Sequence, residues 1–160
     1  MMKRILFCAS ALLLGANAAN AATATGAFNV TLTLNAQCTV SNANNLTFGT
    51  VGLLSGPVNQ TSTFQVTCTN ATPYTVGLNA GQYPSGAQRQ MLNASTTQYV
   101  AYNLYQDSAY STPWGNASGV WESGTGTGAA QSFTVYGQVP AQTTPPPGTY
   151  SDTVTITVTY

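Results

Sequence analysis

The chain has 160 residues, and only 4% of them are Asp, Glu, Lys or Arg. This length predicts one domain. From residue 5 onward Arg89 is the single basic residue, which excludes a function that requires neutralising a row of nucleic-acid phosphates.

The first twenty or so residues have the pattern of an export signal. Lys3-Arg4 precedes an apolar run over residues 5–14, and small residues follow. This predicts a secretory signal peptide over residues 1–21, with cleavage after Ala18 or Ala24 as alternatives. The apolar run is too short to span a bilayer.

Three cysteines occur in the sequence, and the first, Cys8, would leave with the signal peptide. Cys38 and Cys68 then remain as a pair, and export to an oxidising compartment predicts a disulfide between them. Closing this loop is expected to stabilise the fold by about 3–4 kcal/mol. A metal site is the alternative, but the sequence has no His to complete it, so no metal is expected.

Short strands follow one another along the rest of the chain. Alternation of apolar and polar residues predicts strands over residues 28–40, 64–68, 74–78, 133–139 and 154–160. Residues 99–105 are apolar on both faces except at Asn103 and are expected in a central strand. Gly- and Pro-rich turns separate these runs, and Gly124–Gly128 is interpreted as a surface loop. This organisation predicts an all-β sandwich or barrel.

Few residues are available for catalysis. Without His, nucleophilic systems that depend on a Ser–His or Cys–His pair are excluded. Asp107 and Glu122 are the candidates for a glycosidase pair, and Asp152 is interpreted as a turn or strand-edge residue. We therefore expect that the chain is not an enzyme and uses no cofactor.

Aromatic residues near the Gly-rich loops allow two interpretations. They could form a platform for stacking sugars, or they could fill the core with polar tips at the surface. The residues concerned are Tyr99, Tyr102, Tyr105, Tyr110, Trp114 and Trp121.

Four stretches together resemble the spore coat protein U domain family, which includes subunits of archaic chaperone–usher pili. They are Phe28–Val40, which runs into Cys38-Thr39-Val40; Leu46-Thr47-Phe48-Gly49 with the strand ending at Cys68; Tyr102–Tyr105 with Asp107 and Trp114-Gly115; and Phe133–Gly137, Val139-Pro140 and Pro147–Asp152 with the final Thr-alternating strand. No single stretch is specific, but their order and spacing cover essentially the whole exported chain.

The resemblance implies an incomplete immunoglobulin-like β-sandwich, over residues 35–160, that lacks its last strand. A periplasmic chaperone would fill the resulting groove first, and a donor strand from a neighbouring subunit would replace it. Residues 22–34 are expected to contain this donor segment, although its boundary with the subunit's own first strand is left open. The alternative is that these residues form the first strand of a closed monomer.

The proposed donor face comprises Phe28, Val30, Leu32 and Leu34, which alternation places on one side of an extended strand. At the other end, Tyr160 is expected to end the chain within a strand, which leaves an unpaired sheet edge. The apolar stripe of that strand, Val154, Ile156, Val158 and Tyr160, is expected to pair with the chaperone and then with the donor.

The function expected from this resemblance is that of a structural pilus subunit. It would be exported through the periplasm, pass the outer-membrane usher, polymerise with identical or related subunits at the cell surface, and serve in adhesion and biofilm formation. The alternatives are a spore- or cell-coat structural protein and a carbohydrate-binding adhesin module.

Overall fold

A computed structural model describes residues 21–160 of the chain. The predicted signal peptide, including Cys8, lies outside the described residues except for Ala21. The chain divides into two units, Met1–Thr33 and Leu34–Tyr160. Residues 21–160 contain strands and turns but no helix, and hence none long and apolar enough to cross a membrane.

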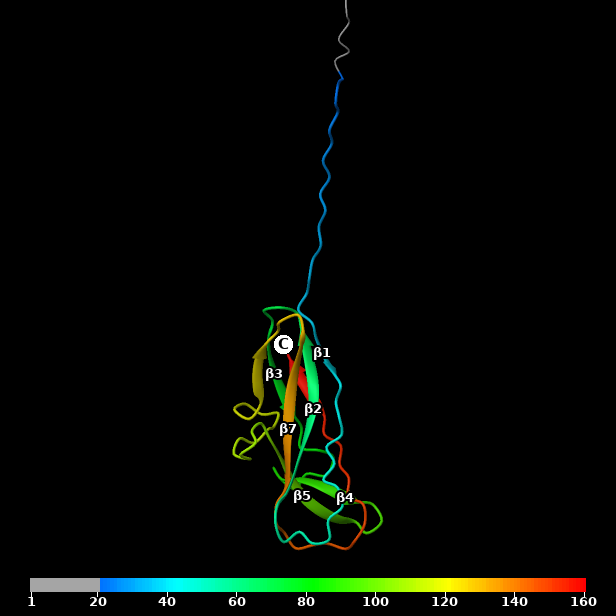
Figure 1. The fold of residues 1–160 in the computed structure, drawn as a ribbon, viewed down its shortest axis with the longest axis vertical. Coiled ribbons are helices and arrows are strands. Elements are labelled where there is room, and N and C mark those ends of the chain that lie inside the picture. Colours follow the sequence, from blue (N-terminus) through cyan, green and yellow to red (C-terminus); the bar gives the residue numbers. More distant parts are fainter. Residues whose placement is uncertain (1–20) are drawn as a thin grey trace, which may run out of the picture. The chain divides into compact units, whose positions relative to one another are not determined.

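The second unit is built from eight strands in two sheets (Figure 1). The larger sheet has the order β1-β2-β7-β5-β4 and the smaller one β6-β3-β8. The strands are β1 (Cys38–Ser41), β2 (Val58–Cys68), β3 (Pro73–Leu78), β4 (Arg89–Asn93), β5 (Gln98–Tyr105), β6 (Glu122–Thr125), β7 (Ala130–Val139) and β8 (Ile156–Thr159).

The core lies between the two sheets, as the alternation of apolar residues dictates. β2 and β7 pair antiparallel over ten residues. Every second residue is buried from Phe64 to Cys68 of β2 and from Phe133 to Val139 of β7. Val76 of β3 faces them from the smaller sheet. Trp114 is fully buried against Phe64, with ring centroids 5.8 Å apart, and its Nε1 donates to the carbonyl of Val76. The fold is thus an all-β, immunoglobulin-like sandwich, as predicted.

The predicted strand over residues 28–40 is much shorter in the structure. Only its last part forms β1, which pairs with β2 and places Cys38 directly opposite Cys68. These cysteines form the predicted disulfide. Residues 21–37 form no strand, which corrects the prediction of one continuous element. Alternation alone fixes the face of an extended segment but not its backbone partner.

Other predictions differ in detail. The strand over 99–105 is central, as predicted, because β5 lies between β4 and β7. The C-terminal strand is shorter than predicted, since β8 excludes Val154 and Tyr160. Gly124 was assigned to a surface loop but belongs to β6, where it pairs with Tyr74. Its missing side chain accommodates the Tyr74 ring, because an added Cβ would lie 2.5 Å from that ring.

Candidate functional site

A large groove runs between the two sheets of the second unit. Its volume is about 1150 Å³. Its floor is formed by inward-facing apolar residues of the larger sheet: Val58, Phe64, Met91, Val100, Leu104, Val135 and Val139. Leu78 and Ile156 contribute from the smaller sheet. The groove is therefore an unfilled part of the sandwich core.

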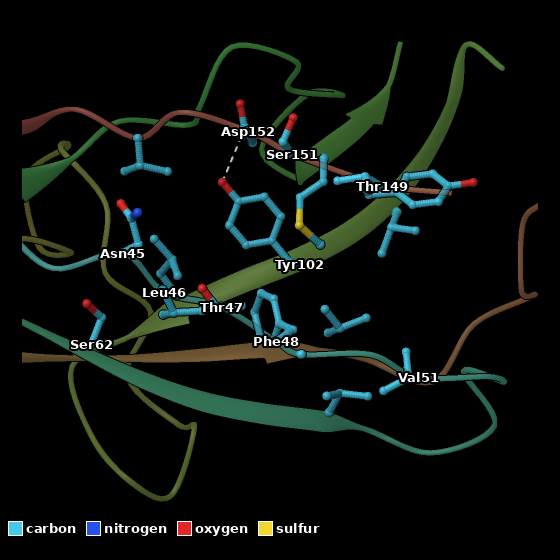
Figure 2. A pocket seen from close by; sticks show the side chains of 18 of the residues that line it. Asn45, Leu46, Thr47, Phe48, Val51, Ser62, Tyr102, Thr149, Ser151 and Asp152 are labelled. Atoms are coloured by element: carbon cyan, nitrogen blue, oxygen red, sulfur yellow. Dashed lines mark hydrogen bonds between the residues drawn. The ribbon is translucent and has the colours of Figure 1, made fainter. Parts of the chain in front are cut away.

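Two segments without strand structure form the walls of this groove. One connects β1 to β2 and lies along the groove from Asn44 to Leu54, and the other precedes β8 and includes residues 144–154. Leu46 and Phe48 of the first wall pack against the core. The Phe48 ring meets the Tyr102 ring edge-on, with ring centroids 6.5 Å apart. Figure 2 shows both side chains in the pocket. Neither wall belongs to the strand ladders of the two sheets.

β8 is an edge strand of the smaller sheet. It pairs with β3 on one side, through the register Leu78–Ile156 to Thr75–Thr159, and has no ladder partner on the other side. Ile156 and Val158 are half-buried and pack against the core, while Thr157 and Thr159 are exposed. Val154 packs in the same way, whereas Tyr160 is exposed. The open edge of β8 is the kind of edge to which an extended segment can add.

The four residues of the predicted donor face are exposed. Between 78% and 85% of the surface of Phe28, Val30, Leu32 and Leu34 is accessible. Every second residue from Phe28 to Leu34 thus exposes a large apolar side chain. Monomeric proteins rarely expose apolar surface of this kind, and where they do it marks an interaction site. Just beyond them, the backbone is held by Thr69, whose Oγ1 accepts from the Gln37 amide and donates to the Asn35 carbonyl.

A polar network beside the groove was missed by the sequence analysis. The Tyr102 hydroxyl on the groove floor donates to Oδ2 of Asp152 in the wall, at 2.7 Å (Figure 2). Burial, and then the hydrogen bond to Asp152, raise the pKa of Tyr102 above its ordinary value. Arg89 is buried nearby, and burial lowers the pKa of its guanidinium. The signal that the sequence offered was Arg89 itself, the single basic residue beyond residue 4 in a chain with only 4% charged residues.

The aromatic residues do not form one sugar-stacking platform. Trp114 and Tyr102 are buried in the core, whereas Trp121 and Tyr99 are partly exposed. Tyr105 and Tyr110 pack edge-to-face instead, and Tyr110 also meets Tyr136 in the same way. The packing interpretation therefore holds for Trp114 and Tyr102.

The carboxylates have structural partners. Asp107 organises the turn that follows β5, because its carboxylate accepts from the amides of Ala109, Ser111 and Thr112 and from the Ser111 hydroxyl. Desolvation raises the pKa of Asp107, but hydrogen bonds from Thr112 and Ser111 outweigh it and lower this pKa to about 2. Burial raises the pKa of Glu122. Residues 21–160 contain no cluster of three or more potential metal-ligating His, Cys, Asp and Glu side chains.

These observations define an immunoglobulin-like β-sandwich with an open interstrand groove and an exposed apolar segment. The Spore Coat Protein U domain family matches residues 24–157, and the chain belongs to this family. Protein U of Myxococcus xanthus is 34% identical over 167 aligned positions, which cover 95% of this chain and 93% of that protein.

One solved structure supports the fold assignment. It is the pre-assembly complex between the chaperone CsuC and the tip adhesion subunit CsuE, from the archaic chaperone–usher Csu pili of Acinetobacter baumannii. The match has 29% identity and a TM-score of 0.58 and covers 80% of this chain. This chain spans only 40% of the matched chain's length.

Proposed function

We propose that this protein is a structural subunit of a chaperone–usher pilus that polymerises by donor-strand exchange. The observation that carries the proposal is the pairing of two complementary features in one chain. One is an apolar groove of about 1150 Å³ bordered by the open edge of β8, and the other is the exposed stripe from Phe28 to Leu34. The similarity to a Csu pilus subunit, at 29% identity, supports this assignment.

The energetics favour insertion between copies. Burying the four stripe residues would contribute on the order of 6–12 kcal/mol, at about 1.5–3 kcal/mol for each side chain. Ordering a segment that makes few contacts opposes this gain, while backbone pairing along β8 adds to it. The resulting fibre would resist mild denaturants, because a strand cannot leave without exposing the groove again.

The proposal includes a chaperone, an usher and further subunits as partners. Before polymerisation, a periplasmic chaperone would supply the strand that pairs with β8 and covers Val154, Ile156 and Val158, with Tyr160 at its end. The outer-membrane usher would then exchange this strand for the segment of the next subunit. The fibre would form at the cell surface, and its role would be adhesion and biofilm formation rather than catalysis.

The two faces of the proposed donor strand provide a matched test. We expect Val30→Asp and Leu32→Asp, on the apolar face, to abolish SDS-resistant multimers in cells that produce the chaperone and usher. Thr31→Asp and Thr33→Asp carry the same charge on the outward face and should assemble. Multimers that form equally well with Leu32→Asp would refute the proposal.

Deletion from the exported start through Leu32 separates a donor strand from a first strand of a closed monomer. A donor segment is dispensable for folding with the chaperone but essential for polymerisation. Loss of an internal strand would instead unfold the domain. Pili assembled from the truncated protein would exclude the donor role.

A coat protein of the same fold is the second candidate, because the family description names a spore coat and Protein U covers nearly the whole chain. Genes for a chaperone and an usher beside this one would favour the pilus. The carbohydrate-binding alternative is not favoured by the burial of Trp114 and Tyr102 in the core.

A further inference from the structure

Polar contacts from two side chains of the larger sheet reach the end of β3 and the wall of the groove. The first comes from Arg89 of β4, a side chain that is 8% exposed. Its Nε donates to the Asn79 carbonyl, and Nη2 donates to the carbonyls of Leu78 and Trp114, at 2.7–2.9 Å. Leu78 is the last residue of β3. Arg89 therefore holds the end of β3 at a fixed distance from β4.

The second contact is the hydrogen bond from Tyr102 to Asp152. Tyr102 belongs to β5 on the groove floor, and Asp152 lies in the wall. Oδ1 of Asp152 also accepts from the amides of Gln82 and Thr153, both at 2.8 Å. The Asp152 carboxylate also lies against Gly81, where an added Cβ would collide with it. Asp152 is thus fixed from three directions.

Asp152 lies where the chain crosses from one sheet to the other. Just before it, Ser151 exchanges two backbone hydrogen bonds with Leu92 at the edge of β4. Just after it, Thr155 accepts from the Asn79 amide and donates to the Asn79 side chain, and β8 begins at the next residue. Any movement of Asp152 relative to Tyr102 would therefore change where β8 lies relative to the groove floor.

We propose that Tyr102 and Asp152 are positioning residues for strand uptake, with Arg89 holding the end of β3, the strand that pairs with β8. Their hydrogen bond holds the open edge of β8 at the distance from the floor that an inserted strand requires. The reason is that an unfilled groove has no core of its own to keep its walls apart, and interiors otherwise close to high packing density. The inference rests on the proposed function, because it assumes that the groove takes up a strand from a neighbouring subunit.

Tyr102→Phe tests the inference, because it removes one oxygen and keeps the ring that packs on Phe48. Tyr136→Phe makes the same chemical change on a partly exposed tyrosine of β7 outside the groove lining and serves as the matched control. The measurement is the rate at which the full-length chain, purified with its chaperone, forms SDS-resistant multimers. We expect Tyr102→Phe to slow this rate about tenfold and Tyr136→Phe to leave it unchanged.

Amide hydrogen exchange on the chaperone-bound chain separates a local effect on the wall from a general loss of stability, because it reports each segment separately. Tyr102→Phe should speed exchange in residues 151–159 while exchange in the β2–β7 ladder stays at its wild-type rate. Wild-type assembly rate in Tyr102→Phe, or faster exchange throughout the sandwich, would overturn the inference. Failure of the wild-type chain to form multimers would refute the proposed function itself.

Discussion

Gly137 of β7 lies directly against Leu46 in the wall of the groove. A Cβ at position 137 would be 2.6 Å from Cδ1 of Leu46 and 3.1 Å from the Phe48 ring. The missing side chain lets the segment between β1 and β2 pack on the sheet, as Leu46 and Phe48 both do.

Gly137→Ala is expected to destabilise the sandwich by about 1–3 kcal/mol, because Leu46 must move. At an unobstructed strand position, Gly→Ala would stabilise the fold by about 0.5–1 kcal/mol. The sign of the change in the free energy of unfolding therefore shows whether the contact with Leu46 is present. Guanidinium unfolding, followed by the fluorescence of buried Trp114, measures it. Gly56→Ala, where an added Cβ meets nothing within 4 Å, is the control. A stabilising Gly137→Ala would show that the close contact is absent.

The disulfide joins β1 to β2 at the point where the chain enters the sandwich. Replacing Cys38 and Cys68 together by Ala should lower the free energy of unfolding by about 3–4 kcal/mol, measured as a lower guanidinium midpoint. Mass spectrometry of protein from the periplasm should find neither Cys38 nor Cys68 alkylated. Alkylation of both cysteines in the native protein would contradict the assignment.

Ile156 faces the groove from β8, and Thr157 faces outward. Ile156→Asp would place a carboxylate among apolar side chains at a cost of several kcal/mol unless it is protonated or reaches water. We expect the variant to be lost from the periplasm and from chaperone co-purification. Thr157→Asp should accumulate normally. If chaperone-bound Ile156→Asp accumulates to normal levels, the chaperone does not capture the chain through β8.

The Asp107 turn should persist to unusually low pH. Because the folded-state pKa is lowered to about 2, the ionised carboxylate favours the folded turn above the unfolded pKa, near 3.9. That contribution is lost as the pH falls through about 2. The NMR shifts of the Ser111 and Thr112 amides should therefore stay constant down to about pH 3 and change below it. A midpoint near 4 would show that the carboxylate lacks these partners.

The sequence predicted the elements whose signal is local. Alternation marked β3, β7 and the C-terminal half of β2, where every second side chain is buried, and a run apolar on both faces marked β5. It missed β4, where the buried positions include Arg89 and Asn93, and β6, which consists of Glu, Ser, Gly and Thr. Such strands are specified by their partners rather than by an apolar pattern.

The candidate site was predicted only in part. The donor stripe and the residues of β8 follow from alternation and from the family resemblance. The Tyr102–Asp152 contact spans 50 positions in the sequence, and Arg89 bonds only to backbone carbonyls. No local pattern encodes contacts of this kind, because they depend on where the chain crosses between the sheets.

Photo-crosslinking within assembled multimers tests the donor-strand account most directly. A benzophenone side chain replaces Leu32 in one variant and Thr31 in the other, and the products are mapped by mass spectrometry. We predict that the residue 32 probe links two subunits and attaches to groove residues such as Leu104, Val135 or Ile156 of the neighbour. The residue 31 probe should not reach these residues. Products confined to a single chain, or the same groove residues labelled from both positions, would contradict the account.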